Sequence, residues 1–157
     1  MLAACAALAV AGSGLALPVV VASHFDASGA ANGYMARGAY IGFMVTIIIV
    51  VPLLLAILPG RQLRKPGSRI NLPHRDYWLA PERRAGTVAT VARSLARYAM
   101  GVLLFLCYAH GLVIVANRTA PAQLPAAWLN WGLAVFLLAT LWWAVALVRR
   151  FRRVPAP

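Results

Sequence analysis

Acidic residues are nearly absent from this chain. Among its 157 residues only Asp26, Asp76 and Glu82 carry a carboxylate, against fifteen lysines and arginines. Three separated carboxylates predict neither a pair for general acid and base catalysis nor a two-metal site. Charged residues make up 11% of the chain and hydrophobic residues 62%, which leaves too little polar surface for a soluble domain. We therefore expect a membrane protein that is not an enzyme and needs no cofactor.

Cysteine is also scarce. The two present, Cys5 and Cys107, are expected at different depths of the membrane, so no disulfide is predicted.

Long apolar runs occupy much of the rest. The first, up to Ser23, carries no charge, and three more follow, each about 20 residues long, enough to cross a hydrocarbon core of about 30 Å. The first run lacks a basic start and exceeds the apolar region of a signal peptide, so we expect a retained helix. The sequence predicts an all-α integral membrane protein, a single domain of four transmembrane helices with the third extended into the cytoplasm. The expected ranges are helices 2–22, 39–58, 83–116 and 127–148, connector 59–82 and basic tail 149–157.

Basic residues gather on one side of these helices. Nine lie between the second and third runs and four follow the fourth, so thirteen of fifteen fall on the side that the positive-inside rule assigns to the cytoplasm. Both termini and the connector are therefore predicted to be cytoplasmic. Frequent Ala and Arg with a single Lys indicate a bacterial inner membrane. The net charge of +12 then faces anionic lipid headgroups, and no nucleic-acid partner is predicted.

The connector concentrates charge and aromatic side chains. Its His74-Arg75-Asp76 triplet matches part of a kinase catalytic loop, but the Asn and the other motifs of a kinase are missing. We expect its arginines near lipid phosphates, its Tyr and Trp at the interface, and Pro81 at the start of the third helix. The predicted contacts to lipid or a partner are Arg69, Arg75, Asp76, Tyr77, Trp78, Arg83, Arg84, Arg93 and Arg97.

His110 is the ionisable residue deepest in a predicted span. Such a residue is a functional candidate, and His24 and Asp26 at the outer end of the first run lie within plausible reach. Together the three could hold Zn or Cu, since imidazole and carboxylate suit both metals. The alternative is a neutral imidazole hydrogen-bonded between helices.

The segment LPVVVASHFDASGAANGY, Leu17 to Tyr34, resembles a bacterial membrane family of unknown function that forms the N-terminal domain of SdpI-type immunity proteins. That family's pattern is Leu-Pro, a short apolar stretch, His-Phe-Asn/Asp, Gly, then acidic-Gly-aromatic; Asn32 replaces the acidic residue here. The cytoplasmic INLPHRDYWLAPERR is also similar to small members of the family. The matching residues of the first segment are Leu17, Pro18, His24, Phe25, Asp26, Gly29, Gly33 and Tyr34.

The resemblance extends over about residues 17–82 and implies an immunity role as one function. Physically, the outer segment is expected to form a compact turn in which Gly29 adopts a positive φ, Asp26 accepts backbone amides and His24 caps a helix.

Three functions follow. The first is a small non-enzymatic multi-pass protein, regulatory or immunity-like, that binds another membrane protein or a toxin peptide besides lipid headgroups. The second is an accessory subunit of a larger membrane complex. The third is a metal or proton carrier that uses the outer-side histidines.

Overall fold

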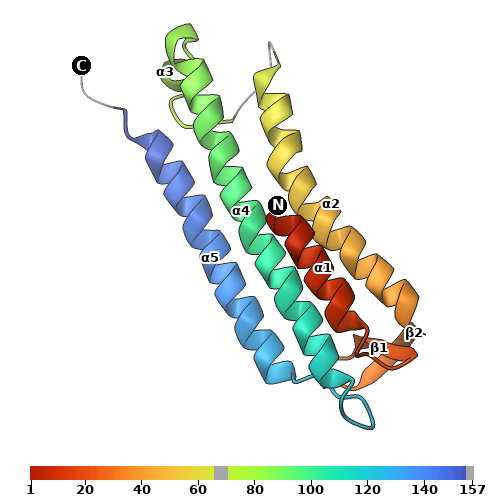
Figure 1. Cartoon of the computed structure of the whole chain (residues 1–157). Coiled ribbons are helices and arrows are strands. Elements are labelled where there is room, and N and C mark those ends of the chain that lie inside the picture. Colours follow the sequence, from red (N-terminus) through yellow and green to blue (C-terminus); the bar gives the residue numbers. More distant parts are fainter. Residues whose placement is uncertain (66–70, 155–157) are drawn as a thin grey trace.

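The protein folds as a set of long helices with a β-hairpin at one end and a short helix at the other (Figure 1). The computed structural model describes residues 1–65 and 71–154. Three helices, α2, α4 and α5, are long and apolar enough to cross a membrane. The elements in chain order are α1 (Leu2–Gly14), β1 (Val20–Phe25), β2 (Ala31–Ala36), α2 (Arg37–Arg64), α3 (Arg75–Trp78), α4 (Pro81–Ala116) and α5 (Ala126–Arg152).

The first helix is shorter than the sequence predicts. A helix over 2–22 is expected, but α1 ends at Gly14 after thirteen residues. The amides of residues 15–17 bond to carbonyls three positions back, Pro18 has no N–H to continue the helix, and the valines after it favour a strand. Thirteen residues span about 20 Å. This is less than the hydrocarbon core, and the N-terminus lies beside the middle of α2 and α4 (Figure 1).

The outer segment predicted as a turn between helices is a β-hairpin. Strands β1 and β2 pair antiparallel from Val20 opposite Ala36 to Phe25 opposite Ala31, with register shifts near His24. His24 lies within β1, opposite Gly33, so its expected helix-capping role is wrong.

Helix α2 runs past the point where a stop is expected. The sequence predicts an end at residue 58, but α2 continues through Pro59 and Gly60 to Arg64 and also contains Pro52. Gly60 is buried against α4, where an added Cβ would lie 3.6 Å from Cβ of Ala92. Packing against a neighbouring helix therefore sustains α2 beyond its prolines.

The two later helices agree well with the sequence. Helix α4 begins at Pro81, the residue expected at the start of the third helix and two positions before the range 83–116, and it ends at 116 as expected. Helix α5 starts within one residue of the predicted 127 but extends to Arg152, four residues into the predicted tail. Its last turn contains Arg149, Arg150 and Arg152, which complement the negative end of the helix dipole.

The core lies toward the hairpin end. Helix α1 packs on α2 and α4, and at Gly14 an added Cβ would meet Ile41 Cγ1 at 2.7 Å, so the two helices approach closely there. Helix α5, in contrast, packs mainly on α4 and forms the outer edge of the molecule (Figure 1). The buried apolar side chains of the main core are Val10, Leu17, Val21, Tyr40, Met44, Ile48 and Leu103.

Candidate functional site

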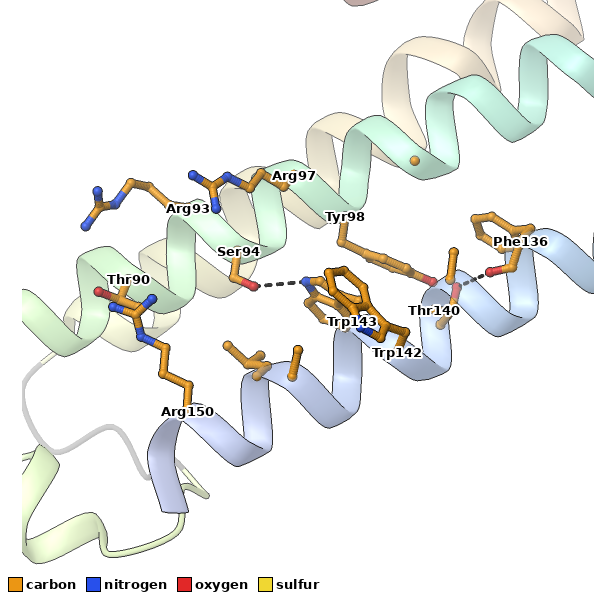
Figure 2. A pocket seen from close by; sticks show the side chains of 14 residues that line it. Thr90, Arg93, Ser94, Arg97, Tyr98, Phe136, Thr140, Trp142, Trp143 and Arg150 are labelled. Carbon is orange, nitrogen blue, oxygen red and sulfur yellow. Dashed lines mark hydrogen bonds between the residues drawn. The ribbon is translucent and has the colours of Figure 1, made fainter. Parts of the chain in front are cut away.

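The first candidate site is a groove between α4 and α5 of about 550 Å³, which we call the α4–α5 groove (Figure 2). This is within the usual range for small-molecule sites of roughly 300–1,000 Å³. It is lined from α4 by Thr90, Arg93, Ser94, Arg97, Tyr98 and Gly101, and from α5 by Phe136, Ala139, Thr140, Trp142, Trp143, Ala146, Leu147 and Arg150.

Aromatic contacts hold the two walls of the groove together. Tyr98 stacks on Trp143 with ring centroids 4.5 Å apart, and Trp143 Nε1 donates a hydrogen bond to Ser94 Oγ at 2.9 Å. Deeper along the helices, Phe105 stacks on Phe136 at 4.6 Å. Small residues also line the groove and leave space in it, because Gly101 is on one wall and alanines are on the other. An added Cβ on Gly101 would meet nothing within 4 Å.

One end of the groove is strongly basic. Arg93 and Arg97 lie one turn apart on α4, and both guanidinium groups point toward the α3 end of the molecule (Figure 2). Arg150 reaches from α5 toward Thr90 on the opposite wall (Figure 2). Within residues 1–65 and 71–154 the one ion pair is between Arg75 and Asp76, so no carboxylate of this part of the chain neutralises the groove. Its polarity therefore changes along its length, from guanidinium groups at one end to aromatic and aliphatic groups at the other.

Three of the predicted connector contacts, Tyr77, Trp78 and Arg83, pack together at the arginine end of the groove. Trp78 Nε1 donates to the Phe151 carbonyl at 2.7 Å, and their rings meet edge to face at 5.4 Å. Thr87 Oγ1 donates to the Trp78 carbonyl at 2.8 Å, while Arg83 lies 4.0 Å from the centroid of the Tyr77 ring. These aromatic residues thus join α3 to the ends of α4 and α5.

The other predicted contacts divide by surroundings. Arg84 Nη2 donates to the carbonyls of Leu63 and Lys65, which ties the end of α2 to the start of α4. Arg75 and Asp76 are exposed and paired at 3.8 Å. Arg69 lies outside the described residues.

The two histidines of the metal hypothesis, which are predicted on the outer side, share a smaller cavity of about 210 Å³. His24 and His110 both line it, together with Tyr40 and Met44. His110 is 3% exposed and bridges helices, since Nε2 lies 3.1 Å from Ser13 Oγ and Nδ1 lies 3.0 Å from the Tyr40 hydroxyl. Both ring nitrogens therefore already have partners, as the alternative of an imidazole hydrogen-bonded between helices predicts.

Asp26 is not part of that cavity. Its Oδ1 accepts hydrogen bonds from the Ser28 hydroxyl at 2.6 Å and from the amides of Ser28 and Ala30 at 2.8 and 3.0 Å. The Ser28 hydroxyl bond, with help from the backbone amides and against a smaller desolvation effect, lowers the pKa of Asp26 below 3.8. Gly29 has φ +86°, so the expected roles of Asp26 and Gly29 in the turn are confirmed. Within residues 1–65 and 71–154 no three His, Cys, Asp or Glu side chains are placed to hold a metal together.

Asn117, at the end of α4, is a structural residue that sequence reasoning missed. Its side chain accepts a bond from the Ala22 amide at 2.8 Å and donates to the Ala22 carbonyl at 2.9 Å, clasping β1. Gln123 Nε2 donates to the Ser28 carbonyl, and the Leu124 amide donates to the Gly29 carbonyl, so the following loop holds the hairpin tip. The only signal in the sequence is that Asn117 directly follows the apolar run, at the start of the polar segment Asn117-Arg118-Thr119.

Comparison with known proteins does not identify a relative of this chain. No family model, curated protein or solved structure matches this chain. The resemblance to the family of SdpI-type immunity proteins is thus a prediction from the residues quoted above, and function has to be argued from the site.

Proposed function

We propose that this chain is a small multi-pass membrane protein that acts by binding another membrane component, and that the α4–α5 groove is where it binds. The observation that carries the proposal is the groove's combination of three arginines without a carboxylate partner among the described residues and an aromatic, largely apolar floor. No pair of carboxylates converges with it, which favours binding over catalysis.

The exposure of α5 supports the same role. None of the side chains in its most apolar stretch is buried, and Phe151 is the one buried residue of the helix. Trp128, Trp131 and Trp142 are each about two-thirds exposed or more. A helix attached along one side leaves its outer face available to lipid or to another transmembrane helix.

Two of the expected functions fit this role. A regulatory or immunity-like protein would hold a membrane protein or toxin peptide at the groove, and an accessory subunit would dock a larger complex there. The third, a metal or proton carrier, is less favoured because His110 has both ring nitrogens hydrogen-bonded and Asp26 is held in the hairpin turn.

We further propose that the hairpin faces the outside of a bacterial inner membrane and that the arginine end of the groove faces the cytoplasm. Helices α2, α4 and α5 cross the bilayer, and α1, which lies within the predicted first span, packs against α2 and α4. A cysteine replacing exposed Gln123 should react with an impermeant maleimide in intact cells, and one replacing exposed Arg75 should react only after lysis. The reverse pattern refutes the orientation.

Site-specific photo-crosslinking tests the binding function. A photoreactive amino acid at Ala139, inside the groove, is compared with one at Leu138, which is 66% exposed and does not line it. The proposal predicts a discrete protein or lipid adduct from position 139 that is weak or absent from position 138. Equal, diffuse labelling from both positions would contradict it.

A further inference from the structure

The nature of the occupant follows from how charge and apolar surface are arranged along the α4–α5 groove. We infer that the groove is a specific site for one anionic phospholipid, with its phosphate between Arg93, Arg97 and Arg150 and an acyl chain along Tyr98, Trp142 and Phe136. This rests on the proposed binding function and names the ligand class of that same site.

Charge complementarity supports an anionic headgroup. The three guanidinium groups come from two helices, and Arg93 Nε makes only a 3.3 Å bond to the carbonyl of Ala89 within its own helix. Guanidinium groups bind phosphate through paired hydrogen bonds. Basic pockets between transmembrane helices on the cytoplasmic side bind lipid headgroups of this kind.

The polarity gradient supports a lipid rather than a free phosphate ion. Beyond the arginines the groove continues past Tyr98 and Thr140 to Gly101 and Phe136, deeper in the predicted spans. A phosphate ion would use only the basic end and would leave the aromatic part uncovered. A phospholipid places its charge and its hydrocarbon at the corresponding depths of a bilayer.

The aromatic wall formed by Tyr98 and Trp143 favours a specifically bound acyl chain over the lipids that surround any membrane protein. Trp143 is fixed by its hydrogen bond to Ser94 and by its stack on Tyr98, so this wall is preformed. The space above Gly101 is open to an added side chain. A preformed groove loses less conformational entropy when it is occupied than a flexible surface does.

The test compares lipid retention by matched variants. The protein is purified in mild detergent with equal amounts of phosphatidylglycerol and phosphatidylcholine, and bound lipid is counted by native mass spectrometry. The groove variant replaces Arg93, Arg97 and Arg150 with Gln. The control variant replaces Arg149, Arg152 and Arg153 with Gln, which removes the same charge from the same end of the molecule but not from the groove.

We expect one retained phosphatidylglycerol per wild-type protein. The groove variant should weaken its binding by about 100-fold, at roughly fivefold per basic side chain near an anionic headgroup, while the control variant retains it. Equal weakening in both variants would show a general surface charge effect and overturn the inference. Circular dichroism and thermal unfolding confirm that each variant is folded.

A second variant tests the acyl part. Gly101→Leu fills the groove without changing charge, and its effect on helix propensity is favourable. It should reduce phosphatidylglycerol retention, and unchanged retention would overturn the acyl assignment, as would displacement of the bound lipid by millimolar inorganic phosphate. The groove variants could instead abolish a protein crosslink from position 139 and leave lipid retention unchanged. In that case the binding function stands and the lipid inference fails. If neither lipid nor protein depends on the groove, both fail.

Discussion

Replacing Asn117 with Ala is expected to loosen the hairpin from the helices. The Asn117 side chain accepts a hydrogen bond from the Ala22 amide and donates one to the Ala22 carbonyl. Because Ala22 is 1% exposed, water does not reach these groups in the folded protein. The third bond, to the Val113 carbonyl, matters less because the Asn117 backbone amide also donates to that oxygen at 3.1 Å. A buried polar group left without a partner costs about 1–3 kcal/mol. With two such groups on Ala22, we expect the free energy of unfolding to fall by about 2–6 kcal/mol.

The assay is reversible unfolding in mixed micelles, followed by circular dichroism, together with hydrogen exchange of the Ala22 amide. Asn117→Asp keeps an acceptor for that amide but loses the donor to the carbonyl, so about half the loss is expected. Asn130→Ala, at an exposed position on α5, serves as the control and should change stability by less than about 0.5 kcal/mol. If Asn117→Ala costs no more than Asn130→Ala, the clasp does not stabilise the hairpin and the reasoning is refuted.

Three further predictions concern the same half of the molecule. Tyr40→Phe removes one partner of the buried His110 ring and should cost about 1–3 kcal/mol in the same unfolding assay, where an unchanged midpoint would count against the bridge. Gly29→Ala places a side chain at a positive φ, which L-residues disfavour, and directs its Cβ at the Leu124 carbonyl oxygen. It should lower the free energy of unfolding by at least about 1–2 kcal/mol, and a neutral result would contradict the turn geometry. Because hydrogen bonds lower the pKa of Asp26 in the folded protein, its carboxylate stabilises the turn above pH 3.8 and this contribution is lost as pH falls through the lower folded pKa. The protection factors of the turn amides, which compare their exchange rates with the intrinsic rates at the same pH, should therefore fall at acid pH in the wild type. Asp26→Asn should abolish that dependence, and the same pH profile of protection in both proteins would exclude the carboxylate as the cause.

The candidate site was only partly predictable. The sequence predicts Arg93 and Arg97 as contacts to lipid or a partner, because arginines beside a span extend their charged groups toward the membrane surface, which is a local property of the sequence. Arg150 was assigned only to a basic tail, because its position in the groove depends on α5 packing antiparallel beside α4 and continuing to Arg152. The metal hypothesis placed His24 near His110 correctly, since both line one cavity, but Asp26 belongs to the turn.

The first twenty-five residues show where local reasoning failed. Uninterrupted hydropathy predicts a helix through residue 22, and hydropathy alone does not distinguish a spanning helix from a short helix followed by an apolar strand. Strand β1 exists because it pairs with β2 and because Asn117, 95 positions along the chain from Ala22, satisfies its outer edge. The stop at Pro18 was present in the sequence, but only these distant partners make a strand the better alternative.

The sequence by itself determined that the protein has three long apolar helices, that its charge is almost entirely of one sign, and where α4 and α5 begin. These are local features, because the apolar length needed to cross a bilayer and the first residue of a helix are both set by neighbours along the chain. The tertiary structure alone decided that the N-terminal run divides into helix and strand, that His110 joins Ser13 to Tyr40, and that three arginines flank one groove. Each of these depends on residues distant in sequence, whose meeting is fixed by how the helices pack rather than by the residues' own preferences.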